Sequence, residues 1–538
     1  MEPNVSRELP KRNLMRGTSA TQALAWVGHA FAEDFREETS GSWEVDHADI
    51  FISHSWSAGR WAKTLALCYD LNLSLAIKVS ILTFLAISCL LLLYAGGFSI
   101  ASIDALAGNP WLLPLTVDMP MAAFFFVFAF GHYCKCWVRQ ILWLDKICIS
   151  QTDVQCKAEA IAALPDFVKR SSRMLILWDE TYFERLWCNV EIAVFLKSHP
   201  DPSAIRMIPL WLSPWLLCSL LLEWVCARYT VPLMFMLLAE WSWVSGAPPQ
   251  SRLDWVLRNV IFCLTSTVAH LPSALLATLS FTLKLRQHGR LLDQLRDFDV
   301  RSSKCTVESD RPMLEAEIAS LHKEQKMSVE DVPLLFRSSG MDVHQEECLD
   351  LFSAYVRGQL HDQIVEELGN RTELPFGLCV LVYMPMHFFN YAESFLACEG
   401  YGCESALQYF GYQSVQQLFI FDAVIYFIMM VTTLPMTFPC LLKMLDLSYL
   451  IPGGAVVQVF FALASGLFSY AYAFCMGGLV GGCLIGFMVK GLSACWLAFF
   501  VGILGFLLVQ CLTVFCAKST WSSCNAGQLG CRCLGRTF

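Results

Sequence analysis

A glutamate in an apolar setting is the residue of this chain best placed to do chemistry. Glu191 ends the run WCNVE, residues 187–191, and apolar Val190 and Ile192 lie on either side of it. Burial of a carboxyl group among apolar residues raises its pKa. Glu191 is therefore a candidate catalytic residue, and the alternative is a glutamate that only supports the scaffold.

The sequence before Glu191 predicts a buried strand that leads into a helix. Residues 173–178, RMLILW, form a short apolar run, a polar corner covers 179–184, and apolar residues then recur at helical spacing from Leu186 to Phe195. Ligands bind to α/β sheets where such strands end. The corner and the first turns of this helix are the expected position of a site.

A second strand ends in residues that could contact a ligand. Residues 48–54, ADIFISH, predict a buried strand, and 60–71 predict a helix after a short turn. His54 and Ser55 lie where this strand ends. They are candidate nucleotide contacts, or they cap the following helix.

Several segments resemble the sequences of Toll/interleukin-1 receptor (TIR) domains. DIFISHSW, residues 49–56, resembles the first TIR strand and its loop, and WCNVE resembles a W-C-x-x-E run that follows the fourth strand. ILWLDKICI, 141–149, resembles part of the third strand. AIRMIPLWL, 204–212, resembles the last strand, although it could also begin a membrane span. The resemblance implies a small α/β domain with a flavodoxin-like parallel sheet.

The resemblance implies two functions. TIR domains signal through association, so homotypic partners are expected. In TIR domains that cleave NAD, the glutamate of this run lies beside the nicotinamide ribose, where a carboxylate can hydrogen-bond hydroxyl groups and stabilise oxocarbenium-like charge. By this resemblance Glu191 is the catalytic residue, His54, Ser55, Trp187 and Cys188 contact the nucleotide, and NAD is a candidate substrate. No bound cofactor is implied.

The chain departs from the TIR pattern after its first helix. A TIR domain continues with a second strand, a BB loop and a second helix, whereas this chain enters two apolar runs near 77–99 and 111–134. Two crossings return a chain to the side of the membrane that it left. We therefore expect a split domain, 43–72 and 137–212, interrupted by a transmembrane hairpin at 73–136.

The composition indicates an integral membrane protein with a helical transmembrane bundle. The chain is 56% hydrophobic and 16% charged, against about 25% charged residues in soluble domains. Runs such as 79–103 and 491–517 contain no charged side chain, and about 20 apolar residues cross a bilayer. We expect about eight spans, within a range of about seven to ten, near 77–99, 111–134, 213–239, 257–283, 374–396, 418–442, 447–489 and 491–517.

The tract 447–489 could hold one long element or two spans, and its pair Gly478 and Gly482 has the G-x-x-x-G spacing of close helix contacts.

Charge predicts the topology and the remaining regions. Residues 284–304 hold six basic side chains, which places this end in the cytoplasm. Beside the TIR-like domain, also cytoplasmic, we expect a cytoplasmic helical region with helices near 285–298, 313–325 and 345–369. The full expected organisation is a polar lead at 1–42, the split domain and its hairpin, a transmembrane part at 213–283, the helical region at 284–373, a transmembrane bundle at 374–517 and a cysteine-containing tail at 518–538.

Other classes of site are disfavoured by the sequence. A net charge of −9 without a block of basic residues argues against nucleic-acid partners. No metal-binding motif appears. Most of the 24 cysteines lie in apolar runs, where a free thiol packs as a small apolar group, so a disulfide framework is not expected. The cysteines of the TIR-like part, Cys68, Cys148, Cys156 and Cys188, indicate a reducing compartment.

A transporter or channel remains open as a third function, beside an interaction module and an NAD hydrolase. Polar side chains in apolar segments often mark a pathway for ions or substrates, and Glu223 could pair with Arg228. The candidates for such a path are Asp118, Glu223, His387, Asn390, Glu393 and Asp422.

Overall fold

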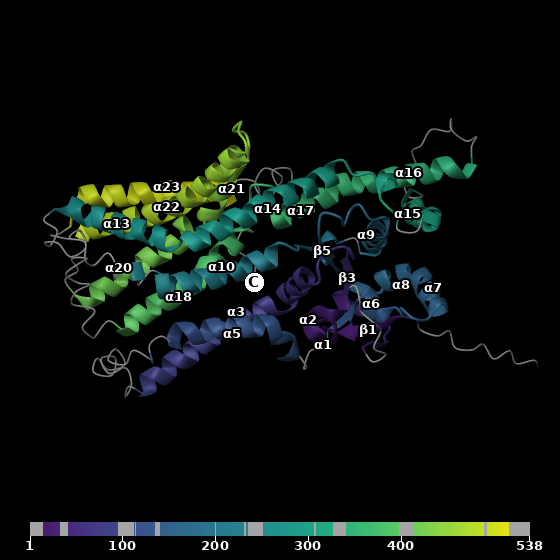
Figure 1. Ribbon diagram of the computed structural model, residues 1–538, viewed down its shortest axis with the longest axis horizontal. Helices are drawn as coiled ribbons and strands as arrows, with labels where there is room; N and C mark the ends of the chain where they lie inside the picture. The colour runs from purple at the N-terminus through teal and green to yellow at the C-terminus, as the bar shows by residue number, and fades with distance from the viewer. Residues whose placement is uncertain are drawn as a thin grey trace, which may run out of the picture. The chain divides into compact units, whose positions relative to one another are not determined.

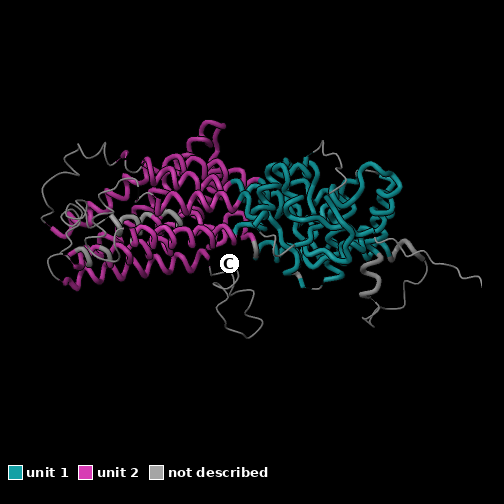
Figure 2. Tube along the Cα trace, turned by 90° about the horizontal axis from the view of Figure 1, so that it is seen from below, with its two compact units in different colours: residues 1–73, 129–214, 287–366 teal, residues 74–128, 215–286, 367–538 magenta. Residues whose placement is uncertain are grey.

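The protein is mostly helical and contains one small sheet (Figure 1). It forms two compact units, shown in teal and magenta in Figure 2. The first comprises residues 1–73, 129–214 and 287–366, and the second comprises 74–128, 215–286 and 367–538. The computed structural model describes residues 14–32, 41–94, 112, 115–134, 140–199, 201–230, 233–234, 251–305, 308–326, 340–397, 414–488 and 492–515.

Four parallel strands form the centre of the first unit. β4 (Ile141–Trp143), β3 (Ala48–His54), β5 (Ser171–Trp178) and β6 (Ile205–Pro209) are neighbours in that order. The prediction that 49–54, 141–147 and 173–178 form neighbouring parallel strands is confirmed, although the strand of the second segment ends at Trp143. The strand interpretation of 204–212 is confirmed for Ile205–Pro209, and helix α10 begins at Leu212.

The sheet is mixed, because two antiparallel strands extend it, one in the segment taken as a polar lead and one at the start of the predicted split domain. β1 (Arg16–Ser19) pairs with β4 and with β2 (Trp43–Glu44). A Cβ atom on Gly17 would lie 2.5 Å from the Ile141 side chain, so this close approach requires glycine. The sequence of β1, RGTS, has no apolar alternation, and periodicity could not reveal it.

Helices surround the sheet in the first unit. α7 (Val154–Ala162) and α8 (Leu164–Lys169) are separated at Ala163, and Pro165 takes its favoured place in the first turn of α8. The helices predicted near 313–325 and 345–369 are confirmed. The helices are α1 (Ala20–Ala23), α2 (Ala25–Gly28), α6 (Asp145–Cys148), α7 (Val154–Ala162), α8 (Leu164–Lys169), α9 (Leu186–Ser198), α15 (Arg311–Lys326), α16 (Gly340–Tyr355) and α17 (His361–Leu368).

A single helix, α3 (Arg60–Tyr94), contains both the predicted helix 60–71 and the start of the predicted span 77–99. Its first turns are fixed to the sheet by the buried carboxylate of Asp70. Asp70 Oδ2 lies 2.6 Å from the Arg173 guanidinium of β5, and Oδ1 lies 2.8 Å from that of Arg206 in β6. One carboxylate thus ties α3 to two parallel strands.

The described elements of the second unit are all helices. Its longest helix, α22, packs against α13 through Gly478 and Gly482, where a Cβ atom would lie 3.0 Å from Val260 Cα and 2.8 Å from Val256 Cα. This contact confirms that the G-x-x-x-G spacing serves packing within the chain. The helices are α5 (Leu115–Cys134), α10 (Leu212–Val225), α13 (Arg252–Ala269), α14 (Leu271–Arg296), α18 (Phe376–Ala397), α20 (Val415–Ile428), α21 (Thr437–Ser448), α22 (Ala455–Met488) and α23 (Ala494–Phe515).

Fewer helices have the length and composition of a membrane span than the eight expected. Among the described residues five qualify, and the bent pair α13 and α14 could add a sixth. The tract 447–489 holds one long helix, α22 (Ala455–Met488), rather than two. α10 stops after 14 residues and continues as a π-helical turn. α18 has 22 residues, but its polar His387, Asn390 and Glu393 lower its hydropathy. The five helices that qualify as membrane spans are Arg60–Leu91, Leu115–Cys134, Ile420–Ser448, Ala455–Met488 and Ala494–Phe515.

We expect Asp70→Asn to lower the free energy of unfolding of the first unit by about 2 kcal/mol, because it removes the negative charge that pairs with the Arg173 and Arg206 guanidinium groups. Urea-dependent proteolysis of the full chain measures the change. Asp166→Asn is the matched control, because the Asp166 carboxylate is 66% exposed and pairs only loosely with Lys169 at 3.9 Å. Equal losses in the two variants would contradict the role given to Asp70.

Candidate functional site

Glu191 lies at one end of a chain of hydrogen bonds that passes through Ser53 of the sheet to Tyr182. Its Oε2 accepts a short hydrogen bond from the Ser53 hydroxyl of β3. The Ser53 oxygen lies 2.6 Å from the Tyr182 hydroxyl, and Tyr182 is fully buried in the corner after β5. Three side chains from a strand, a corner and helix α9 therefore form one connected group.

Burial raises the pKa of Glu191 to about 8, while the hydrogen bond from Ser53 opposes this shift. Burial likewise raises the pKa of Tyr182 well above its ordinary value. Glu191 is consequently protonated at neutral pH and can act as a proton donor. The sequence-based expectation of a raised pKa at this position agrees with the geometry.

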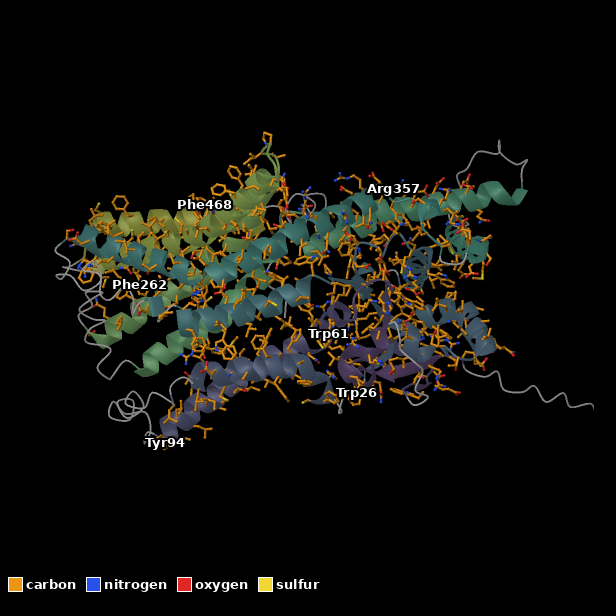
Figure 3. All side chains as sticks on the ribbon, viewed as in Figure 1. Trp26, Trp61, Tyr94, Phe262, Arg357 and Phe468 are labelled. Atoms are coloured by element: carbon orange, nitrogen blue, oxygen red, sulfur yellow. The ribbon has the colours of Figure 1, made fainter. Side chains whose placement is uncertain are left out.

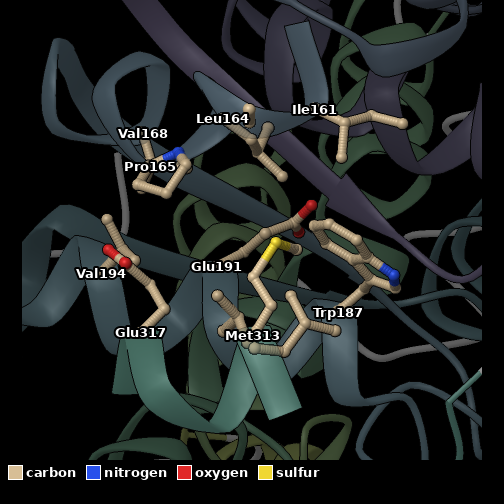
Figure 4. A pocket seen from close by; sticks show the side chains of 12 residues that line it. Ile161, Leu164, Pro165, Val168, Trp187, Glu191, Val194, Met313 and Glu317 are labelled. Atoms are coloured by element: carbon tan, nitrogen blue, oxygen red, sulfur yellow. The ribbon is translucent and has the colours of Figure 1, made fainter. Parts of the chain in front are cut away.

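A small pocket of 150 Å³ opens beside Glu191 (Figure 4). Figure 4 shows Trp187 and Met313 near the Glu191 carboxyl group. Apolar side chains dominate the lining, and pockets for drug-sized ligands usually measure about 300–1,000 Å³. The space therefore suits a group about the size of one ring. The lining residues are Ile161, Ala162, Leu164, Pro165, Val168, Trp187, Val190, Glu191, Val194, Met313, Leu314 and Glu317.

The wall of the pocket opposite α9 comes from α15, which the chain reaches through a strap at 303–304. The Lys304 carbonyl accepts a hydrogen bond from Leu186 N at 3.0 Å. The Asn189 amide donates to the Ser303 hydroxyl at 2.8 Å. These contacts attach the strap to the start of α9 and hold Met313 and Glu317 over the pocket.

His54 lies on the opposite face of the sheet from Glu191. Consecutive strand residues point to opposite faces, so Ser53 faces α9 whereas His54 packs edge-on against Phe31, with ring centroids 5.4 Å apart. His54 Nε2 lies 3.5 Å from Asp145 Oδ1, yet burial lowers the pKa of this imidazole to about 4. The ring is neutral at physiological pH and does not line the Glu191 pocket.

Ser55 belongs to a cluster of hydroxyl groups at the carboxyl ends of β3 and β5. Its Oγ lies 2.7 Å from Ser57 Oγ and 2.8 Å from Thr181 Oγ1. Thr181 donates to the Asp179 carboxylate at 3.0 Å. Burial is the main cause that raises the pKa of Asp179. This polar cluster lies at the position where the fold would present a ligand site, but outside the residues that line the Glu191 pocket.

The two remaining predicted contacts differ in their access to a ligand. Trp187 lines the pocket. Cys188 is 4% exposed, and burial raises its thiol pKa well above the ordinary value. A buried, protonated thiol packs as a small apolar group and is a poor nucleophile. The structure thus joins Glu191 with Trp187 in one pocket, and His54, Ser55 and Cys188 are not among the residues that line it.

Ser53 and Tyr182 were not predicted from the sequence as residues of the site. Ser53 is a hydroxyl residue within the otherwise apolar run IFIS, and a buried hydroxyl needs a hydrogen-bond partner. That rule would have predicted a polar partner for Ser53, but it could not have identified the partner as Glu191. In the described part of the chain no group of three His, Cys, Asp or Glu side chains is placed to hold a metal ion.

Comparisons with protein-family models, with curated proteins and with solved structures find no match to this chain.

The raised pKa of Glu191 makes the stability of the first unit depend on pH. Between the ordinary carboxyl pKa of 4.5 and about 8, the unfolded chain has released this proton while the folded chain retains it, so stability falls as pH rises. We expect Glu191→Gln to remove this loss. Between pH 5 and pH 8, the free energy of unfolding of the variant should rise by more than about 1 kcal/mol relative to that of the wild type.

Denaturant unfolding of the full chain at a series of pH values measures this gain. Glu159→Gln, a substitution of an exposed glutamate on α7, is the control and should follow the wild type. A Glu191→Gln variant with the pH dependence of the wild type would show that Glu191 does not retain its proton on folding.

Proposed function

We propose that this chain is a multi-pass membrane protein that signals by association through a TIR-like domain in its first unit. The strand order supports the proposal. In chain order the parallel strands are arranged second-first-third-fourth, which is the order of the first four strands in flavodoxin-like sheets. The antiparallel strands β1 and β2 extend the sheet beyond β4.

The strand order also changes one correspondence with TIR domains. Residues 141–149 were matched to the third TIR strand, but β4 lies where the second strand of such a sheet lies. The second TIR strand is therefore better explained as β4, which comes later in the chain than the TIR pattern predicts. The helical pair α3 and α5 is inserted before it, and α7 and α8 follow it at the place of the second TIR helix.

An exposed aromatic surface carries the proposal of association. Trp26 is 86% exposed and Trp61 is 58% exposed (Figure 3). The Thr64 hydroxyl contacts the Val27 carbonyl at 3.4 Å, so the Trp26 turn packs on the helix that carries Trp61. Exposed tryptophans are enriched among residues that dominate binding energy in protein interfaces.

The backbone under this surface is strained. Trp26 and Val27 have φ values of 48° and 56°, a region that costs a bulky side chain on the order of 1–3 kcal/mol. Gly28 approaches Thr64 so closely that a Cβ atom would lie 1.9 Å from its hydroxyl. Strain held on an exposed turn supports a function for the presented side chain, and the proposed partner is a second copy of this chain.

We expect Trp26→Ala and Trp61→Ala each to weaken self-association of the full chain in lipid nanodiscs by about tenfold or more, because interface tryptophans commonly contribute over 1 kcal/mol. Energy transfer between labelled copies measures the affinity. Val154→Ala, which changes an 83% exposed side chain on α7, should leave it unchanged. A wild type that remains monomeric at micromolar concentration would contradict association through this surface.

Hydrolysis of NAD is a second candidate, favoured by the connected group of Glu191, Ser53 and Tyr182 beside Trp187. An indole can stack on a nicotinamide ring, and the Glu191 carboxyl group, once it has released its proton, can stabilise developing positive charge at the ribose. The pocket of 150 Å³ accepts the ring but not the whole dinucleotide. This function therefore requires α15 to move away from α9 when substrate binds.

If the chain cleaves NAD, Glu191→Gln should lower turnover by about 100-fold or more, while Glu159→Gln keeps the wild-type rate. Release of nicotinamide from NAD by purified full-length protein measures turnover. A Gln variant with full turnover would exclude Glu191 as the catalytic residue. A wild type without turnover would leave association as the function of the domain.

A further inference from the structure

Two irregular stretches of the second unit meet beside a buried acid–base pair. α10 passes into a π-helical turn at Cys226–Thr230, and α13 and α14 are separated by a bend of 61° at His270. The Thr230 hydroxyl donates to the Ala269 carbonyl at 2.8 Å, which joins the two stretches. Such turns and broken helices within apolar bundles often form functional sites.

The pair consists of Glu223 and His270. Glu223 Oε2 lies 3.4 Å from His270 Nε2, and the residues are 1% and 5% exposed. The expected partner of Glu223, Arg228, instead pairs with Asp118 at 3.2 Å. The second carboxyl oxygen of Glu223, Oε1, is buried without a hydrogen-bond partner among the described residues.

The hydrogen bonds of His270 show that the pair holds a proton. His270 Nδ1 lies 2.7 Å from the Ser266 carbonyl oxygen, which can only accept, so Nδ1 carries a hydrogen. In a neutral ring Nε2 would then present a lone pair to Glu223. Two lone pairs facing each other in an apolar interior repel, so a proton must lie on Nε2 or on Oε2.

The groups around the pair come from four helices. Ser273 of α14 lies 3.6 Å from Cys226 Sγ, and Cys226, Tyr383 and Tyr470 interact electrostatically with Glu223. His387 of α18 interacts with His270. The His270 ring also packs on Phe474 of α22, at 4.9 Å between centroids.

We propose that Glu223 and His270 form a proton-binding site through which the second unit carries protons. The proton moves between Nε2 and Oε2, where one N–H or O–H bond forms as the other breaks. Its departure leaves one uncompensated negative charge in an apolar interior. That charge favours renewed protonation, and buried carboxylates and histidines form proton relays of this kind in membrane proteins.

Nitrogen NMR of histidine-labelled full-length protein tests the bound proton, with His270→Gln identifying the signal. At about pH 8, His270 Nε2 should carry the proton or accept a strong hydrogen bond from Glu223 in the wild type. In Glu223→Gln it should become an unprotonated nitrogen. A wild-type Nε2 that neither carries a proton nor accepts a strong hydrogen bond would overturn the site.

Proton flux into liposomes that enclose a pH-sensitive dye tests the transport role. The wild type should dissipate an imposed pH gradient faster than empty vesicles, and Glu223→Gln and His270→Gln should each slow this flux about tenfold or more. Asp446→Asn, a partly exposed carboxylate of the same unit paired with Arg371 at 3.4 Å, should keep it. A wild-type flux equal to that of empty vesicles would overturn the transport role.

Discussion

The pairing of β3 with β4 on one side and β5 on the other is the constraint on which the first unit depends. β3 is the first of the parallel strands in the chain, yet it lies inside the sheet. Between β3 and β4 the chain passes through α3 and α5, two helices with the composition of membrane spans. Every later feature of the unit, including the Ser53–Glu191 contact, requires the chain to return and complete this pairing.

The apolar strands could be predicted from the sequence because a buried parallel strand is a short continuous apolar run. The same argument failed for β1, whose residues Arg16–Ser19 are bound by backbone pairing and by a close approach at Gly17. It also failed to show that α3 is continuous, since helix periodicity does not mark where a span begins. The predicted number of membrane spans exceeded the number of described helices that qualify, because apolar composition does not reveal where a π-helical turn or a polar residue interrupts a segment.

The candidate site was only partly accessible to sequence reasoning. Glu191 and Trp187 could be predicted because they lie in one helix after a strand. His54 was placed with them by its position at a strand end, but strand alternation directs its side chain to the other face. The part played by α15 and the strap at Ser303 could not be predicted, because more than one hundred residues separate them from Glu191 and no local pattern specifies such a contact.

Association and chemistry make different demands on the same unit. The Trp26 turn and Trp61 present a fixed, exposed surface, whereas the Glu191 pocket is small and lies under α15. The structure of the full chain in lipid nanodiscs at micromolar concentration tests the central claim most directly. The account predicts two copies in contact through the surface that carries Trp26 and Trp61. Separate copies with this surface exposed to solvent or buried in lipid would contradict it.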